Sequence, residues 1–353
     1  MTSKILIIGP SWVGDMVMAQ SLFKTLRQQH AELKLDVLAP AWSRPILERM
    51  PEVNKALDLP FAHGELGLVK RYRLGKELRQ HNYDQVIVLP NSLKSALVPW
   101  FARIPVRTGW KGEQRGLLLN DCRELDKQRY PLMVERFVAL AYEPGVALEQ
   151  HEPIPVPQLV ATAAGSQAAV EALALDWKPS TQVLGLCPGA EFGDAKQWPA
   201  THYAQIAEIY AAKGWRIALM GSAKDAAVCS EIVSLLPQPL QAQCDNLAGR
   251  TSLGQVIDLL AICAAVVSND SGLMHIAAAL HRPLVAVYGS TSADFTPPLS
   301  DQVELLHTDI SCRPCFKRQC PYGHKRCLTE LLPEQVCNAL ERLLQRVSLA
   351  TLM

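Results

Sequence analysis

The sequence lacks the usual short signatures of nucleotide and metal-diphosphate sites. It contains neither a G-x-G-x-x-G run nor a G-x-x-x-x-G-K-[ST] run, so dinucleotide-dependent dehydrogenases and P-loop enzymes lose their main support. It also has no D-x-D pair. A diphosphate bound by this chain would therefore be neutralised by basic side chains and helix amides instead of a divalent metal held by paired carboxylates.

An excess of charge of either sign is also missing, as are long apolar runs. The 35 basic and 34 acidic residues nearly cancel, which argues against nucleic acid held by bulk charge. No apolar stretch approaches the roughly 20 residues that span a bilayer, and no cleavable leader is recognisable. We expect a cytoplasmic protein with small or locally charged partners and no nucleic acid.

What the sequence does contain is a regular alternation of short apolar runs and longer amphipathic ones. KILIIG, LKLDVLAP and YDQVIVLPN alternate with helical patterns, and the same plan resumes with QVLGLCPG, WRIALMGS, AAVVSND and PLVAVYGS. This pattern predicts parallel sheets with crossover helices. The 353 residues suffice for two such domains. We therefore expect an α/β protein with two Rossmann-like, doubly wound domains that face a cleft.

A proline-rich stretch marks the expected boundary between the halves. Prolines at 144, 153, 155 and 157 disfavour a helix over residues 143–159. We therefore expect an N-terminal domain over 1–160 and a C-terminal domain over 161–332. The segment 333–353 is expected to form a last helix, beginning at Pro333, that packs back toward the N-terminal domain.

Ligands of parallel sheets bind at the carboxyl ends of the strands, so the loops that follow strands carry the candidate chemistry. In GPSWVGD, Asp15 lies at the start of a helix. Stabilisation of that helix by its dipole is one explanation of the carboxylate. A general base in a cleft is the other, because a carboxylate ionised at pH 7 can accept a proton from a hydroxyl group.

The loop SNDSGLMH places a second carboxylate at a helix start. The backbone amides of Ser271, Gly272 and Leu273 and the helix dipole form an anion site suited to a diphosphate. Helix capping by Asp270 or Ser271 is an equally ordinary account. His275, one turn further on, is either a packed histidine or a neighbour of that anion site.

Two further loops add a cation and a carboxylate. Lys196 in CPGAEFGDAKQW is either a solvated lysine or a cation that neutralises a leaving phosphate. Asp225 in GSAKD is either a helix cap or a clamp for ribose hydroxyls.

These motifs together resemble a known enzyme family. The combination of GPSWVGDMVMAQSL, LAPAW, VLPNSLKSAL, RTGW, CPGAEFGDAKQWP, GSAKD, NLAGRTSL and NDSGLMHIAAAL is similar to the bacterial heptosyltransferases of glycosyltransferase family 9. The resemblance runs to about residue 298. It implies a GT-B arrangement, with the acceptor on the N-terminal domain and the nucleotide sugar on the C-terminal one.

The resemblance also implies a reaction. It is transfer of L-glycero-D-manno-heptose from ADP-heptose to the first heptose of the lipopolysaccharide inner core, with inversion at the anomeric carbon and no cofactor required for the chemistry. Asp15 matches the family's proposed base. The donor-binding residues implied are Lys196, Asp225, Thr251, Asp270, Ser271, Gly272, Leu273 and His275. A related transferase acting at another core position or with another nucleotide sugar, or a noncatalytic nucleotide-sugar binder, remains an alternative.

An anionic, amphiphilic acceptor draws attention to basic residues in the first half. One group lies on a predicted helix (Lys70, Arg71, Arg73, Lys76 and Arg79), and another follows it (Arg103, Arg107, Lys111 and Arg115). A solvated helix face explains such a run. Transient docking to anionic lipids, peripheral on the inner face of the inner membrane, is the alternative.

Four closely spaced cysteines near the end of the chain are outside this chemistry. Cys312, Cys315, Cys320 and Cys327 follow the spacing C-x2-C-x4-C-x6-C. They suggest a structural zinc or iron-sulfur site that braces the loop. Free thiols or occasional disulfides explain the same residues.

Overall fold

The computed structural model describes residues 3–61, 65–148 and 151–352. The chain divides into two compact units, Met1–Gln158 and Leu159–Met353, and each is described by itself.

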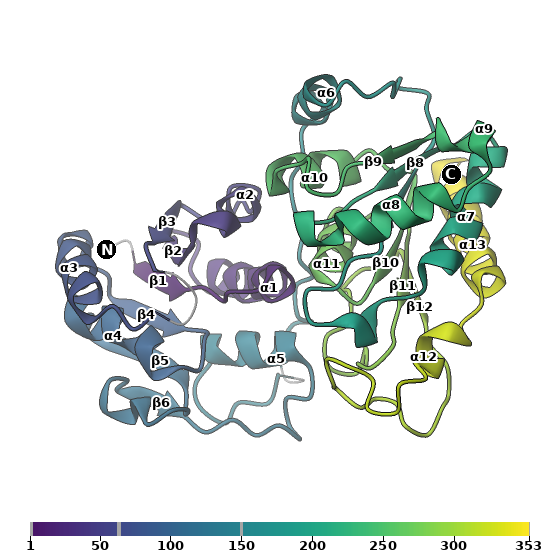
Figure 1. Ribbon diagram of the computed structural model, residues 1–353. Helices are drawn as coiled ribbons and strands as arrows, with labels where there is room; N and C mark the ends of the chain where they lie inside the picture. Colours follow the sequence, from purple (N-terminus) through teal and green to yellow (C-terminus); the bar gives the residue numbers. More distant parts are fainter. Residues whose placement is uncertain (1–2, 62–64, 149–150, 353) are drawn as a thin grey trace. The chain divides into compact units, whose positions relative to one another are not determined.

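The first unit is built on a six-stranded parallel sheet in the order β3-β2-β1-β4-β5-β6 (Figure 1). Its strands are β1 (Lys4–Ile8), β2 (Lys34–Pro40), β3 (Lys55–Leu59), β4 (Gln85–Val88), β5 (Val106–Trp110) and β6 (Asp121–Arg123). Its α-helices are α1 (Val13–Gln29), α2 (Arg44–Leu47), α3 (Leu68–Leu78), α4 (Leu93–Ala102) and α5 (Met133–Val138). Helices α1 and α5 pack together, as do α3 and α4.

The second unit repeats this plan in the order β12-β11-β10-β7-β8-β9. Its strands are β7 (Val183–Cys187), β8 (Arg216–Leu219), β9 (Cys244–Asn246), β10 (Ala265–Asn269), β11 (Leu284–Val287) and β12 (Val303–Leu306). Its α-helices are α6 (Ala163–Ala172), α7 (Ala200–Ala212), α8 (Ala226–Ser234), α9 (Gln238–Gln241), α10 (Leu253–Leu260), α11 (Gly272–Ala279), α12 (Arg326–Thr329) and α13 (Pro333–Leu352).

The central strands explain why the sheets form. All five residues of β7 and of β10 are buried, and four of the five in β1 are, so apolar residues dominate these strands, as expected where helices cover both faces of a sheet. Every strand pair is parallel. The predicted fold class, with two doubly wound Rossmann-like units, is confirmed.

Both sheets have the strand order in which the direction of winding reverses once. The reversal lies between β1 and β4 in the first unit and between β7 and β10 in the second. Loops that leave adjacent strands at such a switch point diverge to opposite faces and open a crevice for ligands. The candidate chemistry is therefore expected after β1 and β4, and after β7 and β10.

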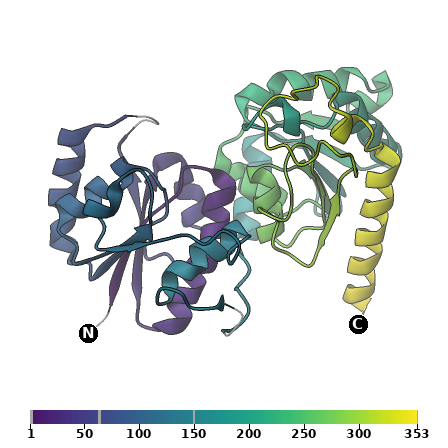
Figure 2. The ribbon, with the colours of Figure 1, turned by 90° about the horizontal axis from the view of Figure 1, so that it is seen from below.

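The last helix belongs to the core of the second unit. Helix α13 starts at Pro333, as predicted, and packs against β11, β12 and α7 along the outside of this sheet (Figure 2). Val336, Leu340 and Leu343 are fully buried there. That this helix also packs toward the N-terminal domain stays a prediction. In the part of the chain that the structure describes, no helix is both long and apolar enough to span a bilayer.

Candidate functional site

The loops after β7 and β10 bring a lysine and an aspartate together at the switch point of the second unit. The ammonium group of Lys196 lies 2.6 Å from Oδ2 of Asp270. The same carboxylate oxygen accepts a hydrogen bond from the hydroxyl of Thr291, at 2.5 Å, from the loop after β11. Because the side chain of Asp270 is only 5% exposed, this pair is largely removed from water. A buried ion pair is weak evidence for a purely stabilising role, so its position at the switch point of the sheet makes this pair a candidate for function.

Asn269, the last residue of β10, fixes these loops to each other. Its side-chain oxygen accepts hydrogen bonds from the Trp198 backbone N–H and the Tyr203 hydroxyl, while its amide group donates to Pro188. All of these bonds are buried. The backbone on either side of Lys196 is thus held by the strand that leads into Asp270.

The start of α11 has no side-chain cap. Ser271 is the N-cap residue, yet its side chain makes no capping hydrogen bond, and Asp270 is engaged by Lys196 and Thr291. The capping explanation for these two residues therefore does not apply in this structure. The first-turn amides, including those of Gly272 and Leu273, keep the partial positive charge of a helix N-terminus.

His275 lies in the same helix and is buried. Burial lowers its pKa to about 4, although Asp270 nearby opposes the shift. The imidazole is consequently neutral at pH 7. It can pack or form a neutral hydrogen bond at the site, but it does not supply positive charge for a phosphate.

Asp225 forms a capping box with Ser222 and lies close to Gly189 and Gly221. Its carboxylate accepts hydrogen bonds from the N–H and hydroxyl of Ser222, both at 2.8 Å. A Cβ added at Gly189 would lie 2.4 Å from this carboxylate, so the loop after β7 can pass over it only because residue 189 is glycine. The structure brings Asp225 to the loop of Lys196. Thr251 instead donates to the Leu247 carbonyl.

Asp15 follows β1 at the switch point of the first unit, the position that β7 occupies in the second. It is in the first turn of α1, which follows β1 at the switch point, and its side chain is partly exposed. The N-cap residue of this helix is Trp12, which has no capping side-chain bond. A carboxylate here is placed both to stabilise the helix and to face a ligand at the carboxyl edge of the sheet.

Several basic residues of the first half have structural roles. Arg71 is buried and donates to the carbonyls of Glu65, Leu66 and Lys94. Arg115 is also fully buried and bonds Trp110 and Asn91. Neither residue can contact a lipid headgroup. Among the predicted docking residues on α3, Lys70, Arg73 and Lys76 are exposed, and Lys70 forms an ion pair with Glu65.

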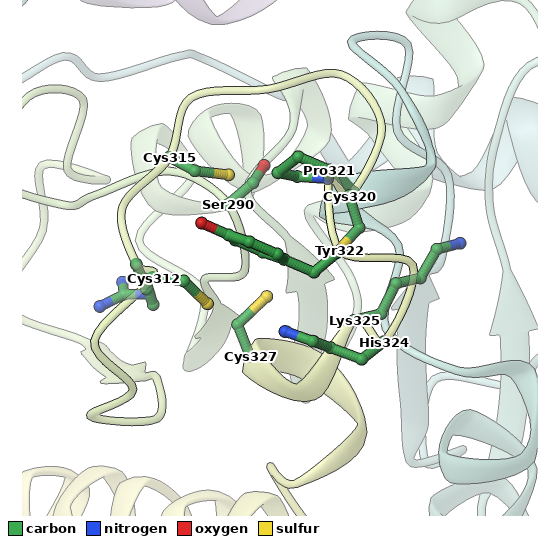
Figure 3. A pocket seen from close by; sticks show the side chains of 11 residues that line it. Ser290, Cys312, Cys315, Cys320, Pro321, Tyr322, His324, Lys325 and Cys327 are labelled. Carbon is green, nitrogen blue, oxygen red and sulfur yellow. The ribbon is translucent and has the colours of Figure 1, made fainter.

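The four cysteines line one small pocket together with Tyr322 and His324 (Figure 3). In this view the Tyr322 ring lies between the side chain of Cys315 and those of Cys312 and Cys327. The pKa of Cys320 is lowered by hydrogen bonds from backbone N–H groups, most of all that of Lys325 and then those of residues 322–324. Burial raises the pKa of Cys327.

The metal site predicted for these cysteines stays a prediction. Among the described residues, no three His, Cys, Asp or Glu side chains are arranged to hold a metal ion. Close spacing along a loop does not by itself turn the thiols to a common centre.

Sequence reasoning missed Thr291, Asn269 and Phe192. Thr291 follows β11, so the rule that ligands bind after strands already pointed to it. Phe192 places its ring 4.9 Å from the Lys196 ammonium group. The role of Asn269 could not be predicted, because a polar residue at the end of a buried strand does not indicate which loops its side chain will bond.

The second unit thus has a largely buried lysine and aspartate pair beside a helix N-terminus without a side-chain cap, an arrangement of residue types that suits an anionic ligand. The comparisons with known proteins give the family. The family model for "Glycosyltransferase family 9 (heptosyltransferase)" matches residues 71–326. The chain belongs to this family and is a glycosyltransferase.

Individual relatives cover almost the whole chain. Lipopolysaccharide heptosyltransferase 2 of Salmonella typhimurium is 49% identical over 97% of this chain and 98% of its own length. Lipooligosaccharide heptosyltransferase 2 of Haemophilus ducreyi is 49% identical over 97% and 99%. The solved structure of Escherichia coli ADP-heptose lps heptosyltransferase II superimposes with a TM-score of 0.89 at 47% identity, covering 98% of this chain and 99% of that one.

Proposed function

We propose that this protein is an ADP-heptose:lipopolysaccharide heptosyltransferase II. It would move L-glycero-D-manno-heptose from ADP-heptose to the first heptose of the inner core. The observation that carries the proposal is similarity over nearly the whole chain to proteins named for this activity, at 47–49% identity. The buried Lys196 and Asp270 pair at the switch point of the second unit supports it, because an ADP-sugar needs a site for a diphosphate beside one for sugar hydroxyls.

In this proposal the second unit holds the donor. The first-turn amides of α11, at Gly272 and Leu273, and the Lys196 ammonium group bind the diphosphate. Asp270 accepts hydrogen bonds from heptose hydroxyls, with Thr291 fixing its orientation. Asp225 is assigned to the ribose, and Ser271, Thr251 and neutral His275 line the donor site.

The first unit holds the acceptor and the base. Asp15 takes the proton of the attacking acceptor hydroxyl as the new bond from that oxygen to the anomeric carbon forms. The bond from the anomeric carbon to the phosphate oxygen breaks, and ADP leaves with its electron pair. A single displacement inverts the anomeric centre and needs only one base, which agrees with one carboxylate at this position.

The experiment that tests the function is transfer from ADP-heptose to purified precursors that carry no heptose or one heptose, read by product mass. We expect addition only to the one-heptose acceptor. Addition to the heptose-free acceptor would make the protein a transferase of another core position. Binding of ADP-heptose with no transfer to either acceptor would favour a noncatalytic binder.

We also propose that α3 docks on the anionic inner leaflet. Its exposed side chains include the apolar Leu68, Val69 and Tyr72 and, interspersed with and following them, the basic Lys70, Arg73 and Lys76. Apolar side chains that enter the headgroup region next to basic residues are the usual pattern of an interfacial helix. Each lysine or arginine near such a surface contributes about 1 kcal/mol.

The prediction concerns binding to vesicles that contain phosphatidylglycerol. Changing both Arg73 and Lys76 to Glu should weaken association at least about tenfold, because two attractive charges become repulsive. The control changes Lys34 and Lys55 to Glu. These two lysines are exposed at the starts of β2 and β3, on the amino edge of the sheet. Equal vesicle binding by the two variants would contradict docking through α3.

A further inference from the structure

Three large apolar side chains stand exposed along the carboxyl edge of the first sheet. They are Trp42 after β2, Trp12 after β1 and Leu93 after β4, with exposed fractions of 40%, 46% and 39%. Strands β2, β1 and β4 are neighbours in that order. We call these residues the apolar edge stripe.

The strand register shows that the two tryptophans are equivalent in position. Ile8 of β1 pairs with Leu38 of β2. Trp12 and Trp42 each follow their member of this pair by four residues. The segments that follow β1 and β2 start from paired residues and have the same length up to each tryptophan. Both tryptophans therefore lie at the same edge of the sheet.

The rings of Trp12 and Trp42 are not part of the buried core. Trp110, Trp177 and Trp198 are buried in the protein. Trp12, in contrast, is an N-cap residue that makes no side-chain capping bond, a position where serine, threonine, aspartate or asparagine stabilises a helix better. An exposed tryptophan at a cap position loses that stabilisation, and neighbouring exposed apolar side chains typically mark a binding surface.

The position of the stripe indicates its ligand. Trp12 precedes the proposed base Asp15 by three residues, in the same helical turn. A group that binds against Trp12 would therefore lie near the first turn of α1, which carries the carboxylate. The C–H face of a pyranose ring is apolar and flat, and its hydroxyls point outward, so it suits an exposed aromatic ring.

We infer that the apolar edge stripe is the acceptor subsite, on which Trp12 and Trp42 stack against sugar rings of the acceptor and present its hydroxyl to Asp15. This inference rests on the proposed transfer reaction and deepens it by assigning positioning residues for the acceptor. Tryptophan is among the residues that contribute most per side chain to binding, because it offers a large rigid surface.

The test uses the full chain with a deacylated, water-soluble one-heptose acceptor, so that membrane docking plays no part. Trp12→Ala and Trp42→Ala should each raise the KM for the acceptor about tenfold or more, with the KM for ADP-heptose within about twofold of wild type. Trp12→Phe and Trp42→Phe should retain most of the acceptor affinity, since a smaller aromatic ring remains. The matched control is Trp100→Ala on α4, a tryptophan of almost equal exposure, 45%, outside the stripe.

Direct binding separates this inference from the proposed function. Titration of the wild-type protein with the acceptor alone should change tryptophan fluorescence, and Trp12→Ala should reduce that change while Trp100→Ala preserves it. Acceptor KM values unchanged in both alanine variants would overturn the inference and leave the transfer reaction intact. Wild-type protein that binds the acceptor through Trp12 but transfers no heptose would instead contradict the proposed function.

Discussion

Asp15→Asn is expected to reduce kcat by roughly 10³-fold, within the range that general bases contribute, while the KM values for both substrates stay within about threefold. Asparagine has almost the same shape as aspartate but does not accept the acceptor's proton at pH 7. The attacking oxygen would then keep its proton in the transition state. Steady-state kinetics with ADP-heptose and the one-heptose acceptor measure this effect.

The competing role of Asp15 is stabilisation of α1 through the helix dipole. That role is worth about 0.3–1 kcal/mol for a surface-exposed carboxylate, and its loss would lower the melting temperature by a few degrees without a large change in rate. The control is Glu113→Gln, because Glu113 is an exposed carboxylate in the loop after β5 at the same edge of the sheet. If Asp15→Asn and Glu113→Gln lose equally little activity, the base assignment is wrong.

The interior strands of both sheets could be predicted from the sequence, with the exception of β5, and the edge strands could not. KILII, VLGLC and AVVSN are buried on both faces, so hydrophobic residues dominate them. The strands β3, β6, β9 and β12 lie at the ends of the sheets and are only partly buried. A short strand with one neighbour needs few apolar residues, and its sequence therefore resembles a loop.

The candidate site shows the same division between local and long-range information. The loops that contain Asp15, Lys196 and Asp270 followed from the alternation of strands and helices. The bond between Lys196 and Asp270 did not, since it joins residues that are 74 positions apart in the sequence. Only the sheet order, which places β7 beside β10, makes them neighbours.

Lys196→Gln is the variant for which we expect the second large effect, a loss of about 10²-fold or more in kcat/KM for ADP-heptose. The ammonium group lies in a largely buried position, where its attraction to a diphosphate is screened less than in water. The same change leaves the buried carboxylate of Asp270 without its cation. Breaking such a pair costs about 3–5 kcal/mol, so the melting temperature should also fall by about 6–20 °C.

A double variant separates the lost binding from the lost stability. Lys196→Gln combined with Asp270→Asn removes both charges, so no unpaired ion remains and the melting temperature should recover most of the loss. Activity should not recover, because the diphosphate still lacks its cation and the heptose hydroxyls lack their acceptor. Thermal unfolding and donor kinetics on the same preparations measure the two effects.

The matched control is the exposed pair of Lys224 and Glu191 on the neighbouring loops. Lys224→Gln should change stability by less than about 1 kcal/mol, as for other surface ion pairs, and should leave the donor KM within about twofold. A double variant at Lys196 and Asp270 that regained wild-type turnover along with its melting temperature would show that the pair only stabilises the fold. Recovery of stability alone assigns the pair to the donor, because the fold can then form without these charges while the reaction cannot proceed at its normal rate.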